Sequence, residues 1–299
     1  MEELYRKLRL ELERHLSILE DKPEETVDST IKALWNKAGG IALSAEKASE
    51  LPLPDLSEEQ KTELIKLTEK RINGIPLAHL TERQNFMGIE LISDKRALIP
   101  RKETEILGRA ALEIGRRQAI KESEIMIMDV CCGSGNLGIA LASMIPEAKV
   151  YSSDLSHDAV KLTRENINFL NLNKRVQVTQ SDLFASFESD EFWGQVDLIV
   201  CNPPYISTSK VLKMNSEIAE NEPSMAFDGG MIGLKIIQSL IKESPKFLKE
   251  TGWVVFEVGL GQGPFVIQLC EKSNQYHTIK SVTDNSGNIR VIAASKSIA

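Results

Sequence analysis

Residues 202–205 read Asn-Pro-Pro-Tyr and directly follow the apolar run VDLIVC, which is typical of a buried strand. Proline fixes φ and has no N–H group, so this turn is stiff and its carbonyl oxygens can accept hydrogen bonds from other groups. The Asn202 side-chain oxygen and the Pro203 carbonyl could each accept one hydrogen of a planar NH2 group. Tyr205 could lie against that group or beside a cation. The turn therefore predicts a clamp for an amide or amine nitrogen; the alternative is a rigid strand-to-loop turn with a packed tyrosine.

A glycine-rich turn follows an earlier apolar run, in the sequence DVCCGSGN at 129–136. Gly133 and Gly135 would let the backbone pass close to a ligand, and the helix expected after them would present unpaired N–H groups. Many nucleotide-binding proteins share such a turn. The dinucleotide pattern G-x-G-x-x-G is not met, because the corresponding residues are Cys131, Gly133 and Asn136. The turn indicates a nucleotide-type ligand other than a dinucleotide.

Carboxylates stand at the ends of the next two predicted strands. Asp154 comes 25 residues after Asp129, at a distance where a carboxylate can accept both hydroxyls of a ribose, and Asp182 ends the following strand. Open α/β sheets bind ligands at the carboxyl ends of their strands, where Asn202 is also expected. Each aspartate taken alone could instead be a helix N-cap. Together they predict a polar rim that holds a ligand.

The elements that must position these residues alternate between strand and helix after about residue 103. The strand-like runs are IMIMDV, KVYSSD, VQVTQSD, VDLIVCN, WVVFEV, YHTIKSV and IRVIAAS, with helical patterns between them. Strand and helix in repetition predict an α/β fold with a doubly wound, mostly parallel sheet.

The first part of the chain has a helical pattern instead. Leu4, Leu8, Leu12, Leu16 and Leu19 recur at helix spacing. Ser57 with Gln60 three residues later forms a capping-box signature for a further helix.

These patterns predict a helical domain at 1–73 and a bridging hairpin at 74–100, where glycine and proline flank short apolar alternations. The α/β domain that carries the predicted ligand site would then occupy 101–299.

Composition narrows the class of protein. With 299 residues, 42% of them hydrophobic, the chain can bury a sizeable core, and a net charge of −7 argues against a general affinity for nucleic acid. Four cysteines without CxxC spacing indicate neither a zinc site nor a disulfide framework, so we expect a cytoplasmic protein without a metal. No apolar run approaches the roughly 20 residues that span a bilayer, so we expect no membrane segment and no signal peptide.

Seven motifs follow one another along the chain: RINGIPLAHLTERQNFMGIEL, LIPRKETEIL, DVCCGSGN, SSDLS, SDLF, CNPPYI and ENEPSMAFDGGMIGL. Motifs in this order resemble those of the release-factor glutamine N5-methyltransferases (the HemK/PrmC family), which are class I S-adenosylmethionine-dependent methyltransferases. The resemblance covers about residues 70–295. It implies a Rossmann-like seven-stranded sheet of order 3-2-1-4-5-7-6, preceded by a small helical domain that recognises the substrate.

The resemblance also implies roles for particular residues. Catalysis falls on the clamp, and binding of S-adenosylmethionine falls on the glycine-rich turn and the rim; two further residues are expected over the substrate pocket. The clamp is Asn202, Pro203, Pro204 and Tyr205, the cofactor set is Asp129, Cys131, Cys132, Gly133, Ser134, Gly135, Asp154, Leu155, Asp182, Leu183 and Asn202, and the pocket residues are Arg101 and Thr104. Cys131 and Glu82 stand where the family usually has glycine.

The implied function is methyl transfer to the side-chain amide nitrogen of a protein glutamine, in the GGQ loop of peptide-chain release factors, by a monomer. Residues 1–70 match the family's helical domain only loosely. An N-methyltransferase of a small molecule or another peptide is therefore an alternative. An adenine N6 DNA methyltransferase shares this type of clamp, but it would need a basic target-recognition region. A cofactor-binding protein without catalysis is a further alternative.

Overall fold

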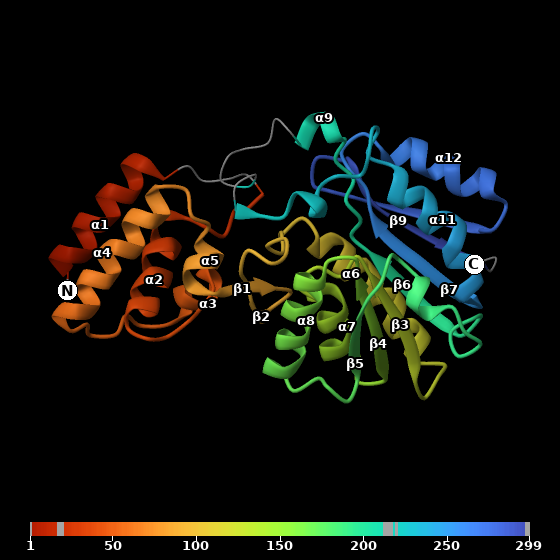
Figure 1. The fold of residues 1–299 in the computed structure, drawn as a ribbon, viewed down its shortest axis with the longest axis horizontal. Coiled ribbons are helices and arrows are strands. Elements are labelled where there is room, and N and C mark those ends of the chain that lie inside the picture. The colour runs from red at the N-terminus through yellow and green to blue at the C-terminus, as the bar shows by residue number, and fades with distance from the viewer. Residues whose placement is uncertain (1, 17–20, 212–217, 219–220, 297–299) are drawn as a thin grey trace. The chain divides into compact units, whose positions relative to one another are not determined.

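The computed structural model describes residues 2–16, 21–211, 218 and 221–296, and it divides the chain into two compact units (Figure 1). The first unit comprises Met1–Lys102 together with Asn215–Glu222, and the second comprises Glu103–Met214 and Pro223–Ala299.

The first unit is largely helical in its described residues. Its described helices are α1 (Glu2–His15), α2 (Val27–Ala38), α3 (Ala45–Glu50), α4 (Glu58–Ile72) and α5 (Leu77–Thr81). Leu8 and Leu12 are buried in its core with Trp35 of α2, whereas Leu19 lies outside the described residues. The predicted capping box is confirmed: Ser57 caps α4, and the Gln60 side chain accepts a hydrogen bond from the Ser57 backbone.

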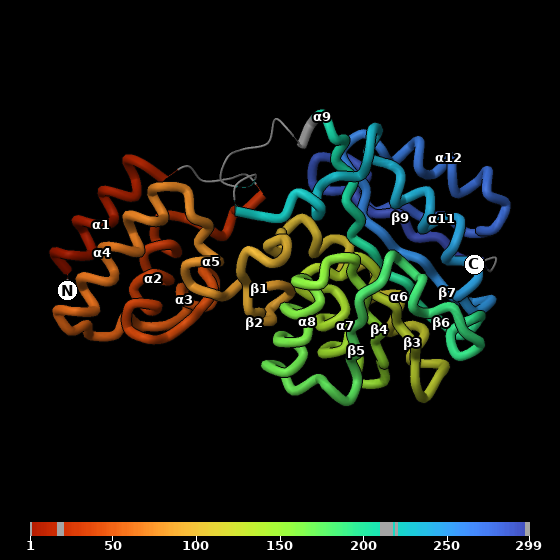
Figure 2. The backbone as a smooth tube through the Cα atoms, in the orientation of Figure 1, coloured from red at the N-terminus to blue at the C-terminus, as the bar shows by residue number. Residues whose placement is uncertain are grey.

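The hairpin expected within 74–100 consists of β1 (Arg83–Phe86) and β2 (Ile89–Ile92), paired antiparallel. Its turn residues Met87 and Gly88 both have positive φ, 53° and 84°, as a two-residue hairpin turn of this hand requires. Helix α5 precedes the hairpin, as the trace in Figure 2 shows, and it was not anticipated. Glu82 ends α5 with φ of 59°, a left-handed conformation that explains why glycine suits this position.

The second unit contains the predicted seven-stranded sheet, in the order β5-β4-β3-β6-β7-β9-β8. Numbered within this unit, the order is 3-2-1-4-5-7-6, so the predicted topology is confirmed. The pairs from β5 to β7 are parallel, and β9 runs antiparallel to both β7 and β8. The strands are β3 (Ile125–Val130), β4 (Ala148–Asp154), β5 (Val176–Gln180), β6 (Val196–Cys201), β7 (Leu248–Glu257), β8 (Thr278–Thr283) and β9 (Ile289–Ser295).

Helices cover both faces of this sheet (Figure 1). One group is α6 (Glu105–Ala119), α7 (Asn136–Met144) and α8 (His157–Phe169), and the other is α11 (Lys235–Phe247) and α12 (Gly263–Ser273). Shorter elements are η1 (Ala185–Phe187), α9 (Thr208–Val211) and η2 (Ser224–Ala226). Strand β6 is buried along its whole length, as a strand covered on both faces must be.

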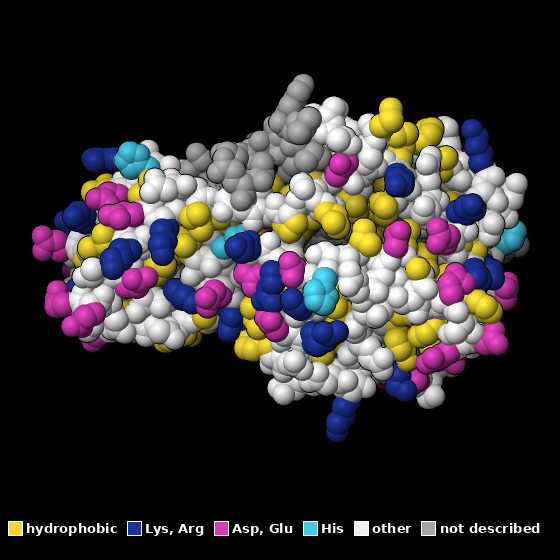
Figure 3. Space-filling model, in the orientation of Figure 1, with side chains coloured by type: hydrophobic (Ala, Val, Ile, Leu, Met, Phe, Trp, Pro, Cys, Tyr) yellow, Lys and Arg dark blue, Asp and Glu magenta, His cyan; other side chains and the backbone are white. Residues whose placement is uncertain are grey.

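The surface carries charges of both signs. On the face drawn in Figure 3, basic and acidic side chains are interspersed rather than gathered into one basic stripe. Among the helices that the structure describes, none combines the length and the apolar character needed to cross a bilayer.

Candidate functional site

The predicted rim residues of the second unit lie at the carboxyl ends of four neighbouring parallel strands. Asp129 lies near the end of β3, Asp154 ends β4, Asp182 follows β5, and Asn202 follows β6. Because these strands are adjacent in the sheet, the four side chains belong to one edge.

The glycine-rich turn links β3 to α7 through three residues with positive φ: Cys131 at 59°, Gly133 at 55° and Gly135 at 80°. A β-carbon on Gly133 would meet no atom within 4 Å, so open space lies in front of this backbone. Cys131 adopts a conformation that costs a residue with a side chain about 1–2 kcal/mol, which explains why glycine suits its position.

The other residues of the glycine-rich turn are held by hydrogen bonds with β4 and α8. Cys132 is buried and its N–H donates to the Ser153 carbonyl at 2.9 Å. The Asn166 side chain of α8 donates to the carbonyl of the buried Ser134 at 3.0 Å. These contacts hold the turn in one shape without using its exposed face.

Asp154 binds the same turn. Its Oδ2 accepts the Gly133 N–H at 2.9 Å and its Oδ1 accepts the Ser156 N–H at 2.8 Å. Burial raises the pKa of this carboxyl, and these backbone hydrogen bonds act against that rise. Each carboxylate oxygen has a second lone pair, so Asp154 can still accept hydroxyl groups. The neighbouring Leu155 is half exposed, as a residue that lies against a ligand could be.

Asp129 is fully buried beneath the turn. Its Oδ2 accepts the Gly138 N–H of α7 at 2.9 Å, whereas its Oδ1 has no hydrogen-bond partner among the described residues. Burial raises the pKa of this carboxyl to about 7, and the charge of Asp154 adds to the rise. Burying an acceptor that receives no hydrogen bond lowers the stability of the fold, unless a ligand supplies the missing donor.

Asp182 and Leu183 close the rim on the β5 side. The Asp182 side chain is exposed, and Leu183 is buried with φ of 46°. The Leu183 carbonyl accepts the Ser153 hydroxyl at 2.9 Å, which fixes this turn to β4. The arrangement leaves the Asp182 carboxylate available to a ligand.

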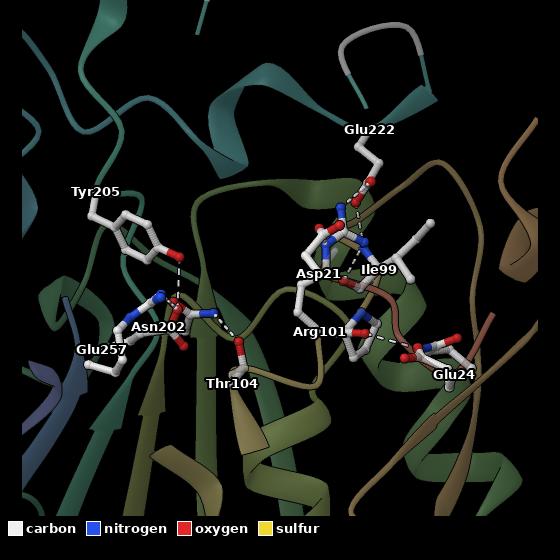
Figure 4. Close-up of polar contacts among 12 residues, drawn as sticks. Asp21, Glu24, Ile99, Arg101, Thr104, Asn202, Tyr205, Glu222 and Glu257 are labelled. Atoms are coloured by element: carbon white, nitrogen blue, oxygen red, sulfur yellow. Dashed lines mark hydrogen bonds and ion pairs between the residues drawn. The ribbon is translucent and has the colours of Figure 1, made fainter. Parts of the chain in front are cut away.

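Asn202, the first residue of the clamp, contacts Thr104. Its Nδ2 donates to the Thr104 Oγ1 at 3.2 Å, as Figure 4 shows, and no donor in the described part of the chain bonds to its Oδ1. Thr104 is the N-cap residue of α6, yet its side chain makes no cap hydrogen bond. The Thr104 hydroxyl is therefore available to Asn202, and the Asn202 oxygen remains an acceptor.

Tyr205 is held from the neighbouring strands. Its hydroxyl donates to Glu257 Oε1 at 2.8 Å, at the end of β7 (Figure 4). Burial and the Glu257 charge raise the pKa of this phenol well above its usual range. Arg290 of β9 lies 3.5 Å from the same Glu257 oxygen and forms an ion pair with Glu103.

Several residues that surround the clamp were not predicted as functional from the sequence patterns. The Gln262 side chain donates to the Tyr205 carbonyl at 3.0 Å, and a β-carbon on Gly229 would lie 2.5 Å from the Pro204 oxygen. Pro203, the second residue of the clamp, is buried. Glu257, Arg290, Gln262 and Gly229 thus position the clamp, and only the motif ENEPSMAFDGGMIGL contains one of them.

Arg101, predicted over the pocket, belongs to the first unit. Its guanidinium is buried and pairs with Glu222 at 2.5 Å and with Asp21 at 2.8 Å. Glu222 also accepts the Ile99 N–H at 2.8 Å. These contacts engage Arg101 inside its own unit, to which Glu222 also belongs.

Comparison with known proteins assigns the class first. The methyltransferase small domain model matches residues 117–281. Among solved structures, the hMettl16 catalytic domain superposes with a TM-score of 0.53 at 12% identity, covering 81% of this chain and 83% of that one. A methyltransferase from Pyrococcus furiosus gives a TM-score of 0.50 at 14% identity, covering 71% and 91%. At these identities the structures show the methyltransferase fold alone.

Relatives of similar length define the family. The release factor glutamine methyltransferase of Clostridium botulinum is 33% identical over 261 residues, which is 86% of this chain and 89% of that protein. The protein of the same name from Thermodesulfovibrio yellowstonii is 33% identical over 244 residues, 82% of this chain and 85% of its own. The chain belongs to the release factor glutamine methyltransferase family.

Proposed function

We propose that this protein transfers a methyl group from S-adenosylmethionine to the side-chain amide nitrogen (N5) of a glutamine, in the GGQ loop of a peptide-chain release factor. Family membership over most of the chain supports the acceptor. We further propose that it acts as a monomer in the cytoplasm, without stable binding to nucleic acid.

The orientation of the Asn202 amide is the observation that carries the chemistry. Its nitrogen is occupied by Thr104, so its oxygen is the end left to a substrate. A primary amide presents two N–H groups, and two acceptors side by side fit them. The Asn202 oxygen and the Pro203 carbonyl provide such a pair at one turn, whose prolines restrict its movement.

The rim fits the proposed cofactor. S-adenosylmethionine supplies a methyl group on a sulfonium sulfur, which leaves as a neutral thioether. The Asp129 oxygen without a partner suits the cationic ammonium of its amino-acid part, and Asp154 suits its ribose hydroxyls. The open space before Gly133 admits the molecule close to the backbone.

The clamp residues have to make an amide nitrogen reactive. Its lone pair is delocalised into the carbonyl, so no side chain of ordinary pKa removes a proton from it beforehand. Acceptance of both N–H groups by Asn202 and Pro203 draws electron density toward the nitrogen and directs its lone pair at the methyl carbon. The nitrogen–carbon bond forms as the methyl leaves its donor, and the proton then passes to solvent. Tyr205 forms one wall of this slot.

The alternative acceptors are less well supported. A small molecule or another peptide would use the same clamp, but the relatives that cover most of the chain are named for release factors. Adenine in DNA would require a basic surface, whereas the chain carries a net charge of −7.

An acceptor panel tests the proposal. Purified protein is incubated with S-adenosylmethionine carrying a radioactive methyl group and, in separate reactions, with a release factor, the same factor with its GGQ glutamine changed to alanine, unmethylated duplex DNA, and free glutamine. We expect label only in the unchanged release factor.

Equal labelling of the glutamine-deficient factor would reject the proposed acceptor, and labelling of DNA alone would select the adenine alternative. Cofactor binding without any transfer would reject catalysis on these acceptors altogether.

A further inference from the structure

Gln262 is a side chain that the proposed transfer step does not use, and it binds the backbone of three separate segments. It stands at the N-cap position of α12, yet it makes no cap hydrogen bond with that helix. Its Nε2 donates to the Tyr205 carbonyl at 3.0 Å and to the Gly233 carbonyl at 3.3 Å, and its Oε1 accepts the Gly259 N–H at 2.9 Å. The side chain therefore joins the last residue of the clamp to the chain just after β7 and to segment 229–233.

These three partners require an amide side chain. A backbone N–H can only donate and a carbonyl oxygen can only accept, so one orientation of the Gln262 amide satisfies all of them. An ionised glutamate would supply the acceptor but no donor, and a lysine would supply donors but no acceptor. Asparagine has the same amide on a side chain that is one methylene group shorter. The chemistry of the partners thus selects glutamine at this position.

The segments that Gln262 joins approach one another as closely as glycine allows. A β-carbon on Gly233 would lie 2.2 Å from the Tyr205 oxygen and 3.0 Å from the Gln262 Nε2. A β-carbon on Gly259 would lie 3.0 Å from Cδ2 of the Tyr205 ring. The last residue of the clamp therefore packs directly against backbone on two sides, and the Gln262 hydrogen bonds hold these surfaces together.

Tyr205 is anchored at both of its ends. Its hydroxyl donates to Glu257 at 2.8 Å, and its carbonyl accepts from Gln262 at 3.0 Å. An anchor at the hydroxyl alone would leave the main chain of this residue free to shift, whereas the second anchor fixes the main chain as well. The wall that Tyr205 forms in the proposed acceptor slot therefore depends on Gln262.

We propose that Gln262 is a positioning residue for methyl transfer: by binding the Tyr205 carbonyl, it holds the tyrosine wall of the acceptor slot against Gly259 and segment 229–233. The inference rests on the proposed function, because its readout is methylation of the release factor. In this role Gln262 contacts neither the acceptor nor S-adenosylmethionine, so its loss should lower the rate of transfer rather than the affinity for either molecule.

Gln262→Met tests the inference, because methionine has about the length of glutamine but cannot donate a hydrogen bond. We expect kcat to fall roughly 10- to 100-fold, as for a slightly misplaced reacting group, while the KM for release factor and the Kd for S-adenosylmethionine change less than about threefold. Gln268→Met is the matched control, because Gln268 is an exposed residue of the same helix. Its kcat should stay within about twofold of wild type.

Gln262→Glu removes the donors while it keeps the size of the side chain and the acceptor for the Gly259 N–H. Its carboxylate would face the carbonyl oxygens of Tyr205 and Gly233, so kcat should fall at least as far as in Gln262→Met. Gln268→Glu adds the same charge at an exposed position of α12 and should leave kcat near wild type. If the charged variant fails to fold, Gln262→Met decides the question.

A double-mutant cycle with Tyr205→Ala shows whether the effect passes through the tyrosine. The wild type, both single variants and the double variant are compared by single-turnover methylation. In the Tyr205→Ala background, Gln262→Met should lower the rate by less than about threefold, because the wall that it positions is already gone. A merely structural role for Gln262 would lower the rate by the same factor in both backgrounds.

Two results separate this inference from the proposed function. A wild-type protein that transfers no methyl to release factor rejects the function itself. An active wild type whose Gln262→Met variant keeps kcat within about twofold, or loses the same factor with and without the Tyr205 ring, overturns the positioning role alone.

Discussion

In the proposed mechanism the Asn202 amide acts through its oxygen, which is available because Thr104 binds the other end of the amide. Removing the side chain should therefore affect the transition state more than the ground state. We predict that Asn202→Ala lowers kcat by about 100- to 1,000-fold, the range found when one preorganised polar group is lost, with little change in cofactor affinity. Single-turnover methylation and calorimetric cofactor binding measure the two quantities.

A matched control is Asn168→Ala, on the exposed side of α8, which should leave both quantities unchanged. Near-normal turnover of Asn202→Ala would show that the clamp is misassigned.

Asp129 couples the proposed cofactor site to the stability of the fold. Its pKa is raised to about 7 by burial, so between about pH 4 and 7 the folded chain holds a proton that the unfolded chain has released. The charged form therefore destabilises the fold as the pH rises. We predict that Asp129→Asn makes the cofactor-free protein more stable than wild type at pH 8, with a difference that grows by about 1.4 kcal/mol per pH unit across that window.

Urea unfolding at several pH values measures this difference. If the free energies of unfolding of the two proteins changed with pH in parallel, the prediction would be wrong. In the same variant, affinity for S-adenosylmethionine should fall, because the lost carboxylate is the proposed partner of its ammonium group.

At the scale of elements, α7 must approach β3 and β4 closely for the glycine-rich turn to form. A β-carbon on Gly138 would lie 2.8 Å from the Asp129 Oδ2 and 3.0 Å from both the Ser152 Oγ and the Val150 Cγ1. We predict that Gly138→Ala costs about 1–3 kcal/mol of stability through overpacking and weakens cofactor binding. Chemical denaturation and calorimetry report the two effects.

Gly115→Ala in α6 is the comparison. There the added carbon would meet the terminal methyl of Ile145 at 2.7 Å and the Leu198 Cδ2 at 3.5 Å, and flexible side-chain ends can move. Its stability should stay within about 1 kcal/mol of wild type, since alanine also favours the helix. If both variants lost the same amount of stability, the close packing of α7 against Asp129 would not explain the effect of Gly138→Ala.

The capping box of α4 makes a prediction for the helical unit. The Ser57 hydroxyl accepts the Gln60 N–H, and the Gln60 side chain accepts in return, so two helix-end donors depend on this pair. Ser57→Ala should lower stability by about 1 kcal/mol, measured by denaturant unfolding of the full chain. Ser57→Asp, which keeps an acceptor, should restore most of it; if Ser57→Ala were as stable as wild type, the cap would make no contribution to stability.

For the whole molecule, the sheet could be predicted because apolar strand runs alternate with helical patterns, and the rim could be predicted because parallel strands end at one edge. Asp129 and Asp154 were found in this way. Helix α5 was missed because five residues are too few for a periodic signal.

Glu257 was missed for a different reason. Its partner Tyr205 lies 52 residues away in sequence, and the Asn202–Thr104 contact spans 98. Likewise, Glu222 pairs with Arg101 of the same unit, 121 residues away in sequence. Such contacts follow from tertiary packing, which local patterns do not encode.

The proposed function depends on which atom of the release factor receives the methyl group. Intact-mass spectrometry of a release factor incubated with this protein and S-adenosylmethionine, followed by fragmentation, tests it most directly. We predict the mass of one added methyl group, located on the side-chain nitrogen of the GGQ glutamine. A methyl on any other residue, or an unmodified factor in the presence of demonstrated cofactor binding, would reject the proposed function.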